Sequence, residues 1–128
     1  MTYLLDTHAL LWWLYDDERL SETAHALMAD VGTTIVVSSA SAWEIATKYR
    51  LGKLPGAGEF VRDMSLWITK AGFRELPVTV AHAQRAGSWP QPHRDPFDRM
   101  IAAQSVIEQL PIVTRDPVFA TFATQVVW

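Results

Sequence analysis

Short apolar runs alternate along this chain with stretches of helical periodicity, and this alternation most constrains the possible fold. The clearest run is Thr34–Ser38, which is continuous and rich in β-branched residues, as is typical of a buried strand. Tyr3–Leu5 and Ile112–Thr114 are shorter runs of the same kind. Strands that alternate with helices predict an α/β fold with a mostly parallel sheet of four to five strands flanked by helices.

The remaining elements fit between these strands. Two further short strands are expected at Phe73–Leu76 and Gln125–Trp128, and Pro117 opens a last helical turn. Trp89–Asp95 contains two prolines and is expected to be a loop. Helices are predicted up to Leu14, from Ser21 as N-cap to about Asp30, and over Ala40–Arg50, Glu59–Lys70, Val80–Ala86 and Pro96–Gln109.

The composition bounds the class of protein. A chain of 128 residues with 49% apolar residues suits one domain, expected over residues 1–128. Cysteine is absent, which excludes disulfides and thiolate metal sites. No apolar segment approaches the ~18 residues of a membrane span, and the first residues lack the basic region of a secretory signal. We therefore expect a cytoplasmic protein without membrane contact.

Four acidic residues follow predicted strands or open the helix beside them: Asp6, Glu44, Asp98 and Asp116. The carboxyl ends of parallel strands meet at one edge of a sheet, where ligands bind. Clustered carboxylates repel each other, and a divalent cation relieves that repulsion. An all-oxygen ligand set favours Mg²⁺ or Mn²⁺ over zinc. Such an ion also reverses the local sign of charge, so a net charge of -3 remains compatible with nucleic-acid binding.

Each of these acids also has a purely structural interpretation. Asp6 could cap the helix that follows it. Glu44 stands four residues before Lys48, which is the spacing of a solvated helical ion pair worth ~0.3 kcal/mol. Asp116 precedes Pro117, and Asp-Pro is a common way to open a helix. The residues alone leave these alternatives open.

Asp95 and Asp98 lie three residues apart at the start of one predicted helix. Asp95 directly precedes a proline and is expected to act chiefly as the N-cap. Asp98 shares a helix face with Ile101, Ala102 and Ser105. A carboxylate at the head of this apolar stripe needs a partner, and we predict that Asp98 is a metal ligand.

Taken together, four segments resemble the PIN-domain, VapC-type toxins. They lie in the family's order and cover the chain from Leu4 to Asp116. None is specific alone, whereas four in order are. The segments are Leu4–His8, Ser41–Ile45, His93–Gln104 and Leu110–Asp116.

This resemblance implies a three-layer PIN-like fold, a Mg²⁺ or Mn²⁺ site and endonucleolytic cleavage of RNA. It also implies a homodimer and a neutralising antitoxin protein. Matched onto the motifs, the catalytic acids are Asp6, Glu44, Asp98 and Asp116, of which Asp6, Asp98 and Asp116 would hold metal and Glu44 would orient the attacking water. Thr114 falls where the family often has a hydroxyl beside the site.

Several basic and aromatic residues near these motifs are candidates for contacts. Their basic members could bind RNA phosphates, although for each one taken singly a solvated surface charge is the preferred interpretation. Trp12 and Trp13 lie on a helix that is apolar nearly all round, and we expect them near a dimer interface. The basic candidates are Lys48, Arg94, Arg99 and Arg115.

Three other classes of protein fit these residues less well. A phosphoaspartyl hydrolase needs a second acid two residues after the first, where this chain has His8. A response-regulator receiver needs an adjacent acidic pair after the first strand and a lysine after the last, and neither is found. A PIN-like binding module without catalysis usually lacks one of the acids, whereas all four are found here.

Overall fold

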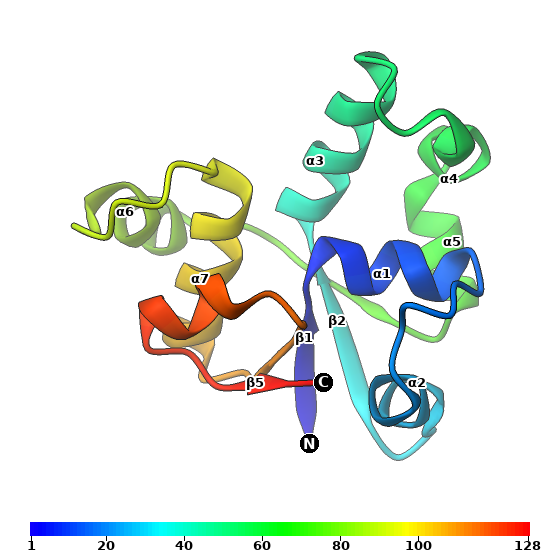
Figure 1. Cartoon of the computed structure of the whole chain (residues 1–128), viewed down its shortest axis with the longest axis horizontal. Coiled ribbons are helices and arrows are strands. Elements are labelled where there is room, and N and C mark those ends of the chain that lie inside the picture. Colours follow the sequence, from blue (N-terminus) through cyan, green and yellow to red (C-terminus); the bar gives the residue numbers. More distant parts are fainter.

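The computed structural model describes residues 1–128 and contains one five-stranded sheet in which every strand pair is parallel (Figure 1). The predicted mostly parallel sheet of four to five strands is thereby confirmed. The strand order is β3-β2-β1-β4-β5. The strands are β1 (Thr2–Leu5), β2 (Thr34–Ser38), β3 (Arg74–Leu76), β4 (Ile112–Val113) and β5 (Val126–Val127).

Strand β1 is the middle strand. It pairs with β2 on one side, where Leu4 lies opposite Val36, and with β4 on the other, where Leu4 lies opposite Ile112. Leu4 and Leu5 are both fully buried, as expected for a strand covered on both faces. Because β1 lies between β2 and β4, Asp6 emerges at the centre of the carboxyl edge of the sheet.

Helices cover both faces of the sheet, with α6 and α7 on one side and α1, α2 and α5 on the other (Figure 1). No helix is both long and apolar enough to cross a membrane. The α-helices are α1 (Thr7–Leu14), α2 (Glu22–Ala29), α3 (Ser39–Arg50), α4 (Gly58–Arg62), α5 (Met64–Lys70), α6 (Val80–Ser88) and α7 (Pro96–Glu108), and 3-10 helices span Pro55–Ala57 (η1) and Pro117–Phe122 (η2).

Two hydrophobic clusters fill the spaces between these layers. Leu5 belongs to the larger cluster, which includes Trp12 and Ile45. Leu4 belongs to the smaller one, which includes Ile101 and Phe119. Successive strand residues point to opposite faces, so this division of neighbouring leucines shows a three-layer arrangement.

The prediction of one helix over Glu59–Lys70 was wrong. The helix is interrupted at Asp63, whose backbone is extended at φ -155° and ψ 78°. The Asp63 side chain accepts a hydrogen bond of 3.2 Å from the Leu66 N–H. Aspartate competes for backbone N–H groups in this way and favours N-caps over helix interiors, so a second helix begins there.

The two tryptophans of α1 pack inside their own chain. Trp12 is only 6% exposed and meets the ring of Trp128 at 5.7 Å. Trp13 meets Phe73 at 5.6 Å and His25 at 5.0 Å. The apolar side chains around α1 are therefore covered within one subunit. They do not require a dimer interface at Trp12 and Trp13.

Candidate active site

Asp6 stands at the carboxyl end of β1 and is almost completely buried. The Thr114 hydroxyl, which follows β4, donates a hydrogen bond of 2.8 Å to Asp6 Oδ2. The same hydroxyl oxygen accepts from the Asp116 N–H at 3.0 Å. Thr114 therefore ties the ends of two adjacent strands together and lies beside the acids, where sequence reasoning placed it.

Burial raises the pKa of Asp6, because a desolvated carboxylate favours its neutral form. The negative charge of Glu44 adds to this increase. The Thr114 hydroxyl and the nearby His8 act in the opposite direction and favour the charged form. Asp6 and Glu44 therefore share one electrostatic environment although 38 residues separate them.

Glu44 lies on the inner side of α3 and is 3% exposed. Its Oε2 accepts a hydrogen bond of 2.5 Å from the Lys48 ammonium group. Its Oε1 is buried and has no partner. The predicted spacing of an ion pair is thus confirmed, but the pair is not on a solvated face, and one carboxylate oxygen remains free for a further ligand.

The pKa of Lys48 depends on several neighbouring acids. Burial alone would lower the pKa of Lys48, but the hydrogen bond and charge of Glu44 raise it overall. The negative charges of Asp95 and Asp98 act in the same direction. Lys48 is therefore the resident cation of this acidic cluster.

Asp98 lies in the first turn of α7 and is hydrogen-bonded to His93 Nε2 at 2.9 Å. Burial raises the pKa of Asp98 to about 6 against the bond to His93, and the charges of Asp95, Asp6 and Glu44 add to the increase. Asp98 therefore lies close enough to Asp6 and Glu44 for their negative charges to raise its pKa. Sequence reasoning had assigned no role to His93, which no spacing rule connects with Asp98.

Asp95 caps α7. Its Oδ1 accepts hydrogen bonds from the Phe97 N–H at 2.9 Å and the Asp98 N–H at 3.3 Å. The predicted N-cap is thereby confirmed. The predicted burial of the stripe that Asp98 heads is confirmed too, since Ile101 and Ala102 are fully buried.

Asp116 also acts as a helix cap, since its Oδ1 accepts from the Val118 N–H at 3.0 Å. Its Oδ2 has no hydrogen bond within the chain. A hollow of about 390 Å³ joins Asp116 to Asp6 and His8. The cap therefore occupies only one oxygen, and the other remains available to a ligand in this hollow.

The acids fit a metal ion in their chemistry but not in their present arrangement. As the side chains stand, no three His, Cys, Asp or Glu residues are grouped closely enough to enclose one. An ion bound through Glu44 Oε2 or Asp98 Oδ2 would have to displace Lys48 or His93. The donor chemistry nevertheless suits a hard divalent cation, because these buried or partly buried carboxylates repel one another, and Glu44 Oε1 has no partner. Such oxygen ligands are stabilised by positive charge.

Arg99, a predicted RNA contact, is occupied elsewhere. Its guanidinium donates four hydrogen bonds to backbone carbonyls of the segment before α7, at 2.6 to 2.9 Å. Only one of the five N–H groups of an arginine side chain is left. Arg99 therefore holds the Trp89–Asp95 loop in place, and we do not retain it as a substrate contact. The accepting carbonyls belong to Ala86, Trp89, Gln91 and His93.

Comparison with known proteins agrees with this geometry. A model of the PIN domain matches residues 3–124. The chain is 40% identical over 78 residues to Ribonuclease VapC16 of Mycobacterium tuberculosis, a match that covers 57% of this chain and 52% of that protein. The chain thus spans about half the length of this curated relative.

Solved structures share the fold at low sequence identity. VapBC2 from Rickettsia felis, bound to a DNA fragment from their promoter, superposes with a TM-score of 0.70 at 15% identity, covering 99% of this chain and 98% of that one. A toxin-antitoxin complex from Klebsiella pneumoniae gives 0.67 at 20% identity, covering 98% and 96%. FitAcB from Neisseria gonorrhoeae gives 0.66 at 21%, covering 100% and 97%.

Proposed function

This chain belongs to the PIN domain family, and from that premise we propose that it is a Mg²⁺- or Mn²⁺-dependent endoribonuclease, the toxin of a toxin–antitoxin pair. One observation carries the proposal above the others. The buried carboxylates of Asp6 and Glu44 and the partly buried carboxylate of Asp98 come from three separate elements and repel one another, and Glu44 Oε1 lacks any partner. We propose the whole of residues 1–128 as a single PIN domain.

In the proposed reaction, each acidic residue of the site has its own role. Asp6, Asp98 and the free oxygen of Asp116 would hold the ion, directly or through water. A bound divalent ion supplies positive charge that neutralises these acids and polarises a phosphodiester. Thr114 holds the Asp6 carboxylate in place through its 2.8 Å hydrogen bond.

Glu44 Oε1 is placed to accept a proton from the attacking water. The water oxygen forms a bond to phosphorus while the bond from phosphorus to the 3′-oxygen breaks in line. The products are a 5′-phosphate and a 3′-hydroxyl that takes up a proton. Lys48 and Arg115 remain as candidate contacts for RNA phosphates, in accordance with the general electrostatic attraction of cations to the backbone.

Cleavage of single-stranded RNA with and without divalent metal tests this proposal. We expect cleavage with Mg²⁺ or Mn²⁺, its loss in excess EDTA and its return when metal is added back. Asp6→Asn should reduce the rate by at least a factor on the order of 100, because loss of a ligand weakens metal binding and activity together. Cleavage that survives EDTA, or a wild type that binds RNA without cutting it, would contradict the proposed activity.

We further propose an antitoxin protein as partner. The structures from Rickettsia felis and Klebsiella pneumoniae are named as VapBC and toxin-antitoxin assemblies, and the acidic cleft would attract a basic side chain when metal is absent. Expression toxicity that a co-encoded neighbouring protein relieves would support this partnership. Toxicity that no such neighbour affects would count against it.

A homodimer remains a proposal, and the surface of α3 is its best candidate interface. Trp43 is 62% exposed and Leu51 is 55% exposed, and large apolar side chains are enriched where subunits meet. A second copy of this chain would cover them. Light scattering at micromolar concentration should give twice the mass of the 14.4 kDa chain, and a monomer would contradict the proposal.

Lys48→Met is expected to tighten Mn²⁺ binding several-fold. The substitution removes the cation that competes for Glu44, so the metal meets a more negative site. Without metal, the same variant should lose about 1 kcal/mol of stability, because buried Glu44 is left unpaired. Isothermal titration calorimetry with Mn²⁺ and thermal melting in EDTA measure the two effects.

Lys53→Met is the matched control for this experiment. Lys53 lines the same hollow as Lys48 and Glu44 but forms no ion pair. Its removal should change Mn²⁺ affinity less than that of Lys48. Equal effects of the two substitutions would show that general charge, rather than the pair with Glu44, governs metal affinity.

A further inference from the structure

The guanidinium groups of Arg19 and Arg115 both pack against the ring of the buried Trp12, near the acidic residues of the candidate active site. The guanidinium carbon of Arg115 lies 4.5 Å from the centre of the Trp12 ring, and that of Arg19 lies 5.0 Å from it. Both arginines and Trp12 line the hollow of about 390 Å³ that also contains Asp6 and Asp116. A pair of arginines therefore adjoins the candidate active site.

The two arginines differ in their partners. Arg19 is fixed by Asp17 through bonds of 3.1 Å from Nε and 2.7 Å from Nη2, and the bond to Arg19 lowers the pKa of Asp17 to about 2. Arg115 is exposed and forms no ion pair within the chain. Its contact with the ring holds the guanidinium in place while its N–H donors stay free, an arrangement suited to a planar anion or a phosphate.

Trp12 cannot serve as a stacking platform for a base. Its side chain is almost fully buried, and its ring is surrounded by the two guanidinium groups, by His8 at 5.6 Å and by Trp128. A ligand entering the hollow therefore meets charge rather than an aromatic face. This favours a phosphate over a nucleobase.

A second hollow, of about 250 Å³, shares His8 with the first. Glu44, Lys48 and Lys53 belong to this second hollow. Each hollow therefore contains cationic side chains beside at least one acid, and a phosphodiester chain that passed His8 from one hollow to the other would meet positive charge in both.

We propose that the hollow formed by Trp12, Arg19 and Arg115 binds an RNA backbone phosphate adjacent to the one that is cleaved. This inference rests on the proposed ribonuclease function. Arg115 is the direct phosphate ligand. Trp12 and the Arg19–Asp17 pair are positioning residues that shape the hollow and hold Arg115.

Binding of a fluorescently labelled single-stranded oligoribonucleotide in EDTA tests the subsite without cleavage. Arg115→Gln should weaken binding about tenfold, as expected for the loss of one charge-assisted contact. The slope of log affinity against log salt should fall in magnitude by about 0.7. Arg115→Lys keeps the charge and should retain the salt slope while recovering only part of the affinity.

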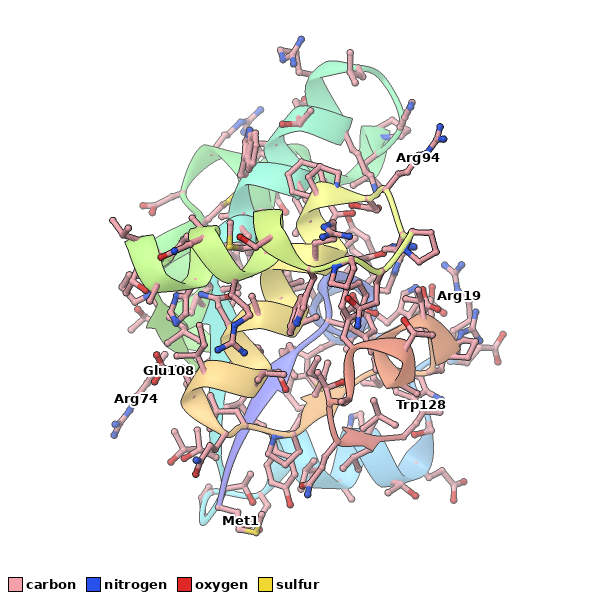
Figure 2. All side chains as sticks on the ribbon, turned by 90° about the vertical axis from the view of Figure 1, so that its left-hand side faces the viewer. Met1, Arg19, Arg74, Arg94, Glu108 and Trp128 are labelled. Carbon is pink, nitrogen blue, oxygen red and sulfur yellow. The ribbon has the colours of Figure 1, made fainter.

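Arg74→Gln is the matched control. Arg74 is exposed, forms no ion pair and lies on the opposite side of the molecule from Arg19 (Figure 2). This variant has the same change in net charge and should bind RNA nearly as the wild type does. Equal affinities and salt slopes for Arg74→Gln and Arg115→Gln would overturn the subsite, and so would a wild type that binds no RNA in EDTA.

The outcomes separate the subsite from the proposed function. If the wild type cleaves RNA and Arg115→Gln binds RNA as tightly as the wild type, the phosphate subsite is contradicted and the ribonuclease function is not. If the wild type binds RNA through Arg115 but never cleaves it, the ribonuclease function is contradicted and the phosphate subsite is not. If Arg115→Gln leaves RNA binding intact but prevents co-purification of the antitoxin, the hollow belongs to an acidic group of the partner protein, and the proposal is overturned.

Discussion

Asp98→Asn is expected to abolish metal-dependent RNA cleavage while the fold is retained. The amide keeps the size of the carboxylate and can still bond to His93, which lies 2.9 Å away. It removes one of the negative charges that would hold a divalent ion, so Mn²⁺ affinity and the cleavage rate should both fall by a factor on the order of 100 or more. Calorimetric titration with Mn²⁺ measures the first effect independently of activity.

The same substitution should stabilise the metal-free protein at neutral pH. Burial, assisted by neighbouring acids, raises the pKa of Asp98 from 3.8 to about 6, so the folded state holds this proton more tightly than the unfolded state. The charged carboxylate therefore costs stability above about pH 6 and costs none below about pH 4. Two units of pKa correspond to about 3 kcal/mol at most, and this is the upper bound of the gain for Asp98→Asn.

Thermal melting in EDTA as a function of pH checks the sign of this effect. The melting temperature of Asp98→Asn should exceed that of the wild type at pH 7.5, and the difference should shrink as the pH falls toward 4. A constant difference across this range would show that the carboxylate charge is not its cause. A decrease at pH 7.5 would show that the bond to His93 outweighs the repulsion among the acids.

Asp95→Asn is the control at the neighbouring acid. Asparagine caps helices nearly as well as aspartate, so this variant should keep most of its activity and stability. Asp95→Ala should lose ~1 kcal/mol, because the Phe97 and Asp98 N–H groups lose their shared acceptor. If Asp95→Asn stopped cleavage and Asp98→Asn did not, the two assignments would be reversed.

The positions of the acids could be predicted from the chain because they depend on local rules. A strand of buried residues fixes where Asp6 emerges, and the topology of parallel strands brings Asp6 and Thr114 to one edge. The choice between Asp95 and Asp98 followed from residue preferences at helix N-termini. An aspartate directly before a proline is typical of an N-cap, and the second aspartate lies about one turn later. Both rules operate within a few residues or along one sheet edge.

The partners of these acids could not be predicted, because they depend on loop conformation and side-chain packing. No periodicity connects His93 with Asp98, or Arg115 with Trp12, although each pair is in contact. The same is true of Arg99, whose four acceptors are backbone carbonyls that carry no sequence signal. Sequence reasoning therefore located the acidic residues and the partner of Glu44, which lies one helical turn away, but missed His93 beside Asp98.

Arg99→Met is expected to be the most destabilising substitution near the site. The guanidinium donates to the Ala86 carbonyl in α6 and to three carbonyls of the following segment, which contains two prolines and has no regular structure. Loss of four hydrogen bonds at about 0.5 to 1.5 kcal/mol each predicts a decrease of about 2 to 6 kcal/mol, since methionine keeps much of the aliphatic stem but offers no donor. The midpoint of urea unfolding measures this decrease.

Two further variants show whether the guanidinium geometry is responsible. Arg99→Lys should recover little stability, because an ammonium group cannot reach four acceptors that are arranged around a planar fork. Arg94→Met removes an arginine of the same loop that is exposed and makes no hydrogen bond, and that extends away from the protein (Figure 2). Its unfolding midpoint should match that of the wild type.

Because His93 is one of the residues held by Arg99, only Arg99→Met should also free the loop around His93, which is measured as faster proteolysis between residues 89 and 95. Unchanged proteolysis together with an unchanged urea midpoint would mean that the loop is held by the packing of Trp89 on Phe122 at 5.0 Å and not by Arg99.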